Sequence, residues 1–138
     1  MNWKRIALGG LLAGLVMNVV DFAVGIFYLM DRYMALQKEG IFLKEPRLPF
    51  TPLWIGGIFC IGLLCAWFYA AVRPRLGGGP KTALLVGLAL ALMTHVPYNV
   101  SMASWGQQGR LLPFAWMVVG IVEVIVGTLV AGWLYKEA

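Results

Sequence analysis

Three ionisable side chains lie inside long apolar stretches of this sequence, namely Asp21, His95 and Glu123. Such groups can bind a proton, a cation or a ligand, and a carboxylate inside a membrane is costly enough to indicate a function by default. Three polar side chains accompany them at similar depth, Asn18, Thr94 and Asn99. We therefore predict one buried polar network that contains all six residues and links the first, third and fourth helices.

Two interpretations of this network remain open. In the first, Asp21 and Glu123 stay protonated or pair with His95 and the asparagines, so that they hold helices together. In the second, they form a proton, ion or ligand site. Each ionisable residue lies about 12 to 15 residues from the predicted cytoplasmic end of its helix, so at 1.5 Å per residue the three share one layer.

His95 has a further interpretation, because a neutral imidazole can be the axial ligand of a haem or a chlorophyll-type pigment. This single histidine cannot supply both axial ligands of a six-coordinate haem, and a hydrogen-bonded histidine beside a kink at Pro97 is the favoured interpretation. The sequence requires no cofactor and predicts no metal site. Lipid is the expected non-protein contact.

Four apolar stretches must position these side chains. They cover residues 6–30, 52–72, 80–105 and 113–136, and about 20 helical residues suffice to cross a bilayer. The chain is 61% hydrophobic and only 12% charged, which is more apolar than a soluble core of this size requires. We predict an all-α fold, a single integral membrane domain over residues 1–138 built as a four-helix bundle. Glycines at helical spacing should let these helices pack closely.

The connection between the second and third spans is short and basic. Arg73, Arg75 and Lys81 surround a glycine turn, Pro74 is expected to end the incoming helix, and Pro80 is expected to begin the next. Short loops rich in Lys and Arg stay on the cytoplasmic side of a membrane. We therefore predict that this hinge and both chain ends face the cytoplasm.

The predicted outer loop covers residues 31–51. Residues 31–39 are compatible with a helix that projects from the membrane or bends along its surface, and Pro46 and Pro49 exclude a regular helix over residues 41–50. We expect the apolar residues 41–43 to lie in the headgroup region or against a partner. Thr51 is expected to cap the second span.

Similar three-residue motifs recur at corresponding places in the two halves of the sequence. Leu48-Pro49-Phe50 precedes the second span as Leu112-Pro113-Phe114 precedes the fourth, and Trp67-Phe68-Tyr69 ends the second as Trp133-Leu134-Tyr135 ends the fourth. A duplicated two-helix unit with both copies in the same direction would explain these recurring motifs. The chance recurrence of Trp and Pro at membrane boundaries explains them equally well.

Motifs of known enzyme classes are absent from the sequence. It contains no GxSxG, HExxH, CxxC, P-loop or dinucleotide fingerprint, and Cys60 and Cys65 lie in one apolar run at a spacing that turns them apart on a helix. The 11 Lys and Arg against 6 Asp and Glu mostly flank apolar runs, so membrane topology explains the positive charge without a nucleic-acid partner. We predict no catalytic activity.

The hinge sequence WFYAAVRPRLGGGPKTA and the sequence EVIVGTLVAGWLYKE in the last span resemble a widespread group of small uncharacterised bacterial four-helix membrane proteins. This resemblance covers nearly the whole chain and implies four spans in a bacterial inner membrane, with no activity attached. A weaker resemblance connects the chain to the small multidrug transporters, which have four spans and a carboxylate in the first, here Asp21. The long outer loop and the second carboxylate, Glu123, depart from that pattern.

We expect a structural function, in which the chain is a non-catalytic accessory subunit that packs against larger membrane subunits and lipid. Energy-converting complexes, photosynthetic or respiratory, commonly contain such chains. The missing catalytic motifs, the apolar loop and the glycine stripes favour this interpretation. The alternative is a small proton-coupled transporter or channel that uses Asp21 and Glu123.

Overall fold

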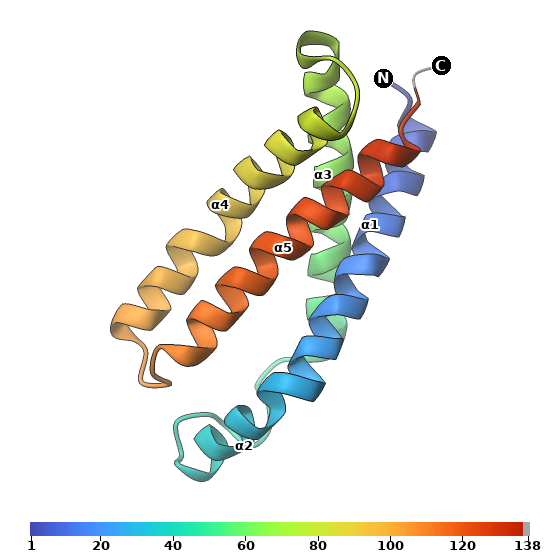
Figure 1. The fold of residues 1–138 in the computed structure, drawn as a ribbon. Helices are drawn as coiled ribbons and strands as arrows, with labels where there is room; N and C mark the ends of the chain where they lie inside the picture. Colours follow the sequence, from blue (N-terminus) through green and yellow to red (C-terminus); the bar gives the residue numbers. More distant parts are fainter. Residues whose placement is uncertain (137–138) are drawn as a thin grey trace.

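The computed structural model describes residues 1–136 as helices joined by loops (Figure 1). Helix α1 (Trp3–Val24) continues through a π-helical turn (Gly25–Leu29) into α2 (Met30–Lys38). The remaining helices are α3 (Phe50–Leu76), α4 (Pro80–Trp105) and α5 (Leu111–Leu134). The described residues contain no strand, so the predicted all-α fold is confirmed.

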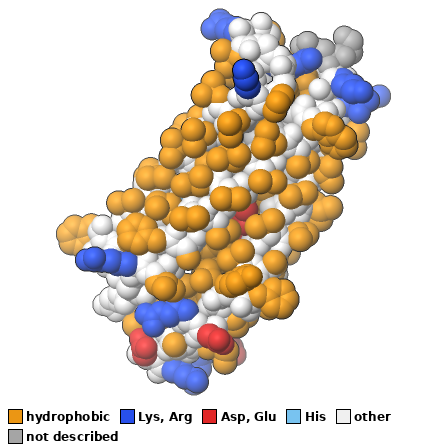
Figure 2. Space-filling view, in the orientation of Figure 1, with side chains coloured by type: hydrophobic (Ala, Val, Ile, Leu, Met, Phe, Trp, Pro, Cys, Tyr) orange, Lys and Arg blue, Asp and Glu red, His pale blue; other side chains and the backbone are white. Residues whose placement is uncertain are grey.

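Four helical stretches are long and apolar enough to cross a membrane, namely Trp3–Lys38, Phe50–Leu76, Pro80–Trp105 and Leu111–Leu134. Apolar side chains cover the visible face between the two ends of the bundle, and Lys and Arg side chains gather toward those ends (Figure 2). An apolar band between charged ends matches the hydrocarbon core and the interfaces of a bilayer. The chain is therefore a multi-pass membrane protein.

The start of α1 and the end of α5 lie at the end of the bundle that also carries the glycine turn at residues 77–79, which we call the hinge end (Figure 1). There the Asn2 backbone N–H donates to the Tyr135 hydroxyl oxygen over 3.2 Å. The opposite end, which we call the loop end, carries residues 39–49 and the turn between α4 and α5 (Figure 1). These two names refer to the ends of the bundle and do not depend on which end faces the cytoplasm.

Close glycine contacts hold the helices in two hairpins, α1 with α3 and α4 with α5, and α5 packs in turn against α1. A Cβ atom added to Gly62 of α3 would lie 2.6 Å from the Gly14 nitrogen of α1. A Cβ atom on Gly87 of α4 would lie 2.9 Å from the Ile125 Cα of α5. Because Cβ atoms do not approach backbone so closely, these contacts require glycine.

Helices α1 and α5 are in close contact at the hinge end and diverge toward the loop end (Figure 1). At the hinge end, a Cβ atom on Gly9 would lie 3.1 Å from the Ala131 carbonyl oxygen. Toward the loop end, the Trp116 ring would lie 3.6 Å from a Cβ atom on Gly25. Small residues therefore bring the helices together at one end, and a large aromatic side chain occupies the wider separation at the other.

Pro80 begins α4 as predicted, but the prolines at the two ends of the second span do not mark helix ends. Helix α3 continues through Pro74 to Leu76 and ends at Gly77, which has φ 80°. At the start of α3, Pro49 occupies the capping position, so Thr51 is not the cap and lies within the first turn. Pro74 removes only one hydrogen bond because it lies near the end of α3. At the start of α3 the backbone N–H groups have no helical partner, so proline is tolerated there as well.

The outer segment is also more ordered than we predicted. The membrane helix extends as α2 to Lys38, and the loop proper covers residues 39–49. Ile41 and Phe42 pack against the core near the loop end, and the Phe42 ring stacks on Tyr33 with 5.6 Å between centroids. Only Leu43 of the predicted apolar tip is exposed, so most of this tip is covered by the chain itself.

The recurring motifs of the two halves occupy different positions relative to their helices. Pro49 precedes α3, whereas Pro113 lies within the first turn of α5. Tyr69 lies inside α3 and Tyr135 follows the end of α5, yet their rings meet edge to face with 6.1 Å between centroids. The duplication of a two-helix unit stays a prediction.

Candidate functional site

Asp21 is buried where α1 meets α3. Its side chain is 6% exposed, and the Trp54 indole N–H of α3 donates to its Oδ2 atom over 2.6 Å. This short hydrogen bond fixes the carboxyl group between two helices. Trp54 was not predicted as part of the site, because tryptophans near span ends are typical interface anchors.

Glu123 lies on α5 and is 5% exposed. Its Oε1 atom is buried and has no hydrogen-bond partner. Its carboxyl group is close enough to that of Asp21 for the two to interact electrostatically. The structure thus brings together the two acidic residues that the sequence analysis singled out, on helices that are far apart in sequence.

Asn18 is the third member of this buried group and is 7% exposed. Its side-chain NH₂ donates to the Gly14 carbonyl oxygen of the same helix over 2.8 Å. Its Oδ1 atom is buried without a partner. One turn of α1 therefore carries both an unsatisfied amide oxygen and the Asp21 carboxyl group.

His95 packs its ring directly against Gly120 of α5, one turn from Glu123. Its Nδ1 atom lies 2.8 Å from the Thr94 hydroxyl oxygen, which can only accept from Nδ1 because its single proton is donated to the Leu90 carbonyl oxygen. An axial-ligand role would require the ring to leave this contact with Gly120. A histidine packed on a glycine is the arrangement that the structure records.

Thr94 and Asn99 do not join helices as the predicted network requires. Thr94 is exposed, and its hydroxyl group donates to the Leu90 carbonyl oxygen of its own helix over 2.7 Å. Asn99 is buried, but its NH₂ group donates to the His95 carbonyl oxygen, also in α4, over 2.8 Å. A local bond to the backbone satisfies a short polar side chain without a second helix, so the network is smaller than predicted.

A second tryptophan makes the other side-chain hydrogen bond between helices in this region. The Trp116 indole N–H of α5 donates to the Tyr33 hydroxyl oxygen of α2 over 2.6 Å. Two tryptophans near the loop end therefore connect the helices around the buried acids.

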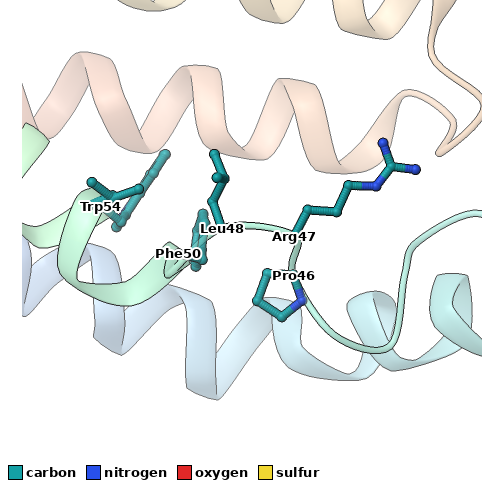
Figure 3. A pocket seen from close by; sticks show the side chains of 6 residues that line it. Pro46, Arg47, Leu48, Phe50 and Trp54 are labelled. Atoms are coloured by element: carbon teal, nitrogen blue, oxygen red, sulfur yellow. The ribbon is translucent and has the colours of Figure 1, made fainter.

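A pocket of about 380 Å³ opens beside this region at the loop end (Figure 3). Leu48, Phe50 and Trp54 lie along it, and the Arg47 side chain extends beyond them (Figure 3). Pro46 and Leu53 complete the lining. Trp54 thus belongs both to the pocket wall and to the hydrogen bond with Asp21.

Two tyrosine side chains make contacts with the basic hinge. The Gly79 N–H donates to the Tyr69 hydroxyl oxygen over 2.9 Å, and the Arg73 guanidinium carbon lies 5.5 Å from the centre of the Tyr135 ring. This cation–π contact connects the hinge to the end of α5. Arg75 and Lys81 lie in the same segment, on either side of the glycine turn.

Within residues 1–136, no three His, Cys, Asp or Glu side chains gather as a metal ion would require. No family model, no curated protein and no solved structure matches this chain.

Proposed function

We propose that this protein is a non-catalytic small subunit of a larger assembly in a bacterial inner membrane, with its hinge end in the cytoplasm. The single observation that supports the proposal is a pair of glycines, Gly56 and Gly57, on the outside of α3. Both are exposed, and a Cβ atom added to either would meet nothing within 4 Å.

The other glycines of the membrane helices differ from this pair. Each of them would place a Cβ atom within 4 Å of another helix of the chain: Gly9, Gly10, Gly14, Gly25, Gly62, Gly87, Gly120, Gly127 and Gly132. A glycine inside a helix costs about 0.5–1 kcal/mol relative to alanine, and close helix approach is what offsets this cost in membrane proteins. Gly56 and Gly57 have no such contact within this chain, which favours a helix of another subunit.

The surroundings of the glycine pair also favour a protein partner. Leu53 and Trp54 lie one turn before Gly57 and are 57% and 42% exposed. Large apolar side chains beside a glycine pair form a step into which the ridge of another helix can pack. The chain has no catalytic motif in its sequence, so binding through this face is the simplest role.

Site-specific photo-crosslinking would test the proposal in membranes of the native host. A crosslinking residue at Gly57 should capture one larger membrane protein, and Gly57→Leu should abolish that crosslink and the co-purification of the same protein. The matched control is a crosslinking residue at Leu64, which is 49% exposed on the same helix and should capture lipid alone. Capture of a second copy of this chain, or of nothing, at Gly57 would contradict the subunit function.

A small proton-coupled transporter is a second candidate, and the buried Asp21–Glu123 pair favours it. Intramembrane acids that face the interior of a bundle are typical of proton pathways. Reconstituted vesicles should then show a proton flux that Glu123→Gln abolishes while the bundle stays folded. Equal fluxes in the two proteins would eliminate this candidate.

A further inference from the structure

We propose that the bundle interior binds one exchangeable proton, held between the Glu123 carboxyl group and the Asn18 amide oxygen and reached from the loop end along Trp54. The proton site does not require the proposed subunit function, although Leu53 and Trp54 belong both to the proposed partner face and to the pocket at the loop end.

The first argument is an imbalance between hydrogen-bond donors and acceptors. The Trp54 N–H is used by Asp21, and the Asn18 NH₂ group is used by Gly14. The Glu123 Oε1 and Asn18 Oδ1 atoms are both buried acceptors without a donor. Because a protonated carboxyl group is a donor, a single proton on Glu123 can satisfy both oxygens in one hydrogen bond.

The second argument is the register of α1 against α5. Gly9 lies against Ala131, and a Cβ atom on Gly127 would lie 3.6 Å from the Ala13 Cβ atom. The two helices run in opposite directions, so one further turn places Glu123 opposite the turn of α1 that contains Asn18. The two atoms without partners thus belong to facing turns of neighbouring helices.

The groups around this position offer no positive charge. Asp21 lies one turn along α1, and the Tyr33 hydroxyl of α2 accepts from the Trp116 indole N–H of α5. Cys65 of α3 lies in the core cluster that contains Val124, next to Glu123, and His95 of α4 covers Gly120. On α4, Tyr98 is 64% exposed. The Lys and Arg residues of the described chain lie outside this layer, toward the ends of the bundle: Lys4, Arg5, Arg32, Lys38, Lys44, Arg47, Arg73, Arg75, Lys81, Arg110 and Lys136.

A proton fits this position better than a metal ion does. Hard cations take about six or more oxygen ligands, and the position provides two carboxyl groups and one amide oxygen. A proton needs only one donor oxygen and one acceptor oxygen. The two unpaired atoms, Glu123 Oε1 and Asn18 Oδ1, supply these.

The pocket at the loop end gives the proton a route. Trp54 lines this pocket and donates to Asp21, which interacts electrostatically with Glu123. The indole ring of Trp54 thus connects the wall of this pocket to Asp21. We expect the proton to exchange with the solution at the loop end and to pass Asp21 on its way to Glu123.

Infrared difference spectroscopy of the protein in lipid nanodiscs would test this inference directly. At neutral pH the wild type should show the C=O band of a protonated carboxyl group, and the band should shift in D₂O. Glu123→Gln should remove the band, and Asn18→Leu should shift it because the acceptor of its hydrogen bond is lost. The control Glu39→Gln, at the end of α2, should leave it unchanged.

Thermal unfolding gives a second measurement that does not depend on Asn18→Leu folding. The wild type should lose stability as the pH rises, because the folded state binds a proton that the unfolded state releases. Glu123→Gln carries a permanent donor in the same place and should show a flatter pH dependence. A missing carboxyl band, a band that survives in Glu123→Gln, or a band that never exchanges would overturn the proposal. So would stabilisation by Na⁺ at constant pH that Glu123→Gln abolishes, which would indicate a metal cation.

Discussion

Trp54 and Trp116 supply the indole N–H groups of the two side-chain hydrogen bonds between helices near the buried acids. Each has its ring close to the end of a span, where tryptophan commonly anchors a protein at the interface. Here the N–H groups point inward, to Asp21 and to the Tyr33 hydroxyl, at 2.6 Å in both cases. A tryptophan ring near a span end can thus contact lipid and, at the same time, donate a hydrogen bond to a buried polar atom.

Trp54→Phe should therefore lower the free energy of unfolding. The substitution keeps an aromatic ring in the pocket wall but leaves Asp21 without its donor. We expect a loss of about 0.6–1.7 kcal/mol, the range for polar contacts between helices in bilayers. Denaturant titration in mixed micelles would measure it. Trp67→Phe, at a ring that packs edge to face on Phe68, is the control and should change stability less.

The two buried acids could be found from sequence, and their partners could not. An acid in an apolar stretch stands out wherever it lies, so Asp21 and Glu123 were identified by residue type and depth alone. Thr94 was wrongly placed in the buried network because sequence depth does not tell which face of α4 it occupies. Trp54 was missed because the direction of an indole N–H depends on how two helices pack.

At the scale of elements, Gly62 and Gly57 of α3 differ in their environment. A Cβ atom on Gly62 would lie 2.5 Å from the Gly10 carbonyl oxygen and 2.9 Å from the Gly14 Cα, whereas one on Gly57 would meet nothing. Gly62→Ala should lower the free energy of unfolding by about 1–3 kcal/mol, as overpacking does. In the isolated chain, Gly57→Ala should raise it by up to about 1 kcal/mol through helix propensity. Equal effects of the two substitutions in unfolding titrations would contradict the α1–α3 contact.

The contact between α4 and α5 makes a prediction of its own. A Cβ atom on Gly120 would overlap the His95 ring, so Gly120→Ala should destabilise the bundle by about 1–3 kcal/mol. The same substitution should cost less when His95→Ala has already removed the ring. A double-mutant cycle measures this coupling, which should exceed about 0.5 kcal/mol. Additive effects would show that the ring does not pack there.

The existence of the four spans was predictable, and the boundaries of three of them were not. Long apolar runs and glycine spacing indicated four crossing helices, and the third span was predicted with the bounds that α4 has. The boundaries of the second and fourth spans were misplaced because proline was read as a helix end. Tertiary packing of α2 and of Phe42 also extended order into a segment that sequence pattern indicated as a loop.

At the scale of the whole molecule, the orientation in the membrane is a testable prediction. The basic hinge should lie in the cytoplasm, because Arg73, Arg75 and Lys81 occupy the shortest connection on that side. A reporter that is active only in the cytoplasm should work when inserted at Gly78 and fail when inserted at Lys44. The reverse pattern would invert the topology, and it would place the pocket beside Trp54 on the cytoplasmic side.

The contact between the two chain ends has a consequence for how the protein can be assembled. Because Asn2 touches Tyr135, a short linker could join the ends while the chain is opened within residues 77–79. This circular permutant would begin with α4 and α5 and finish with α1 and α3, and every helix would keep its direction across the bilayer. Two separately synthesised hairpins, residues 1–76 and 80–136, should also associate into the same bundle. The order in which the hairpins are made along the chain is therefore not needed to specify the structure.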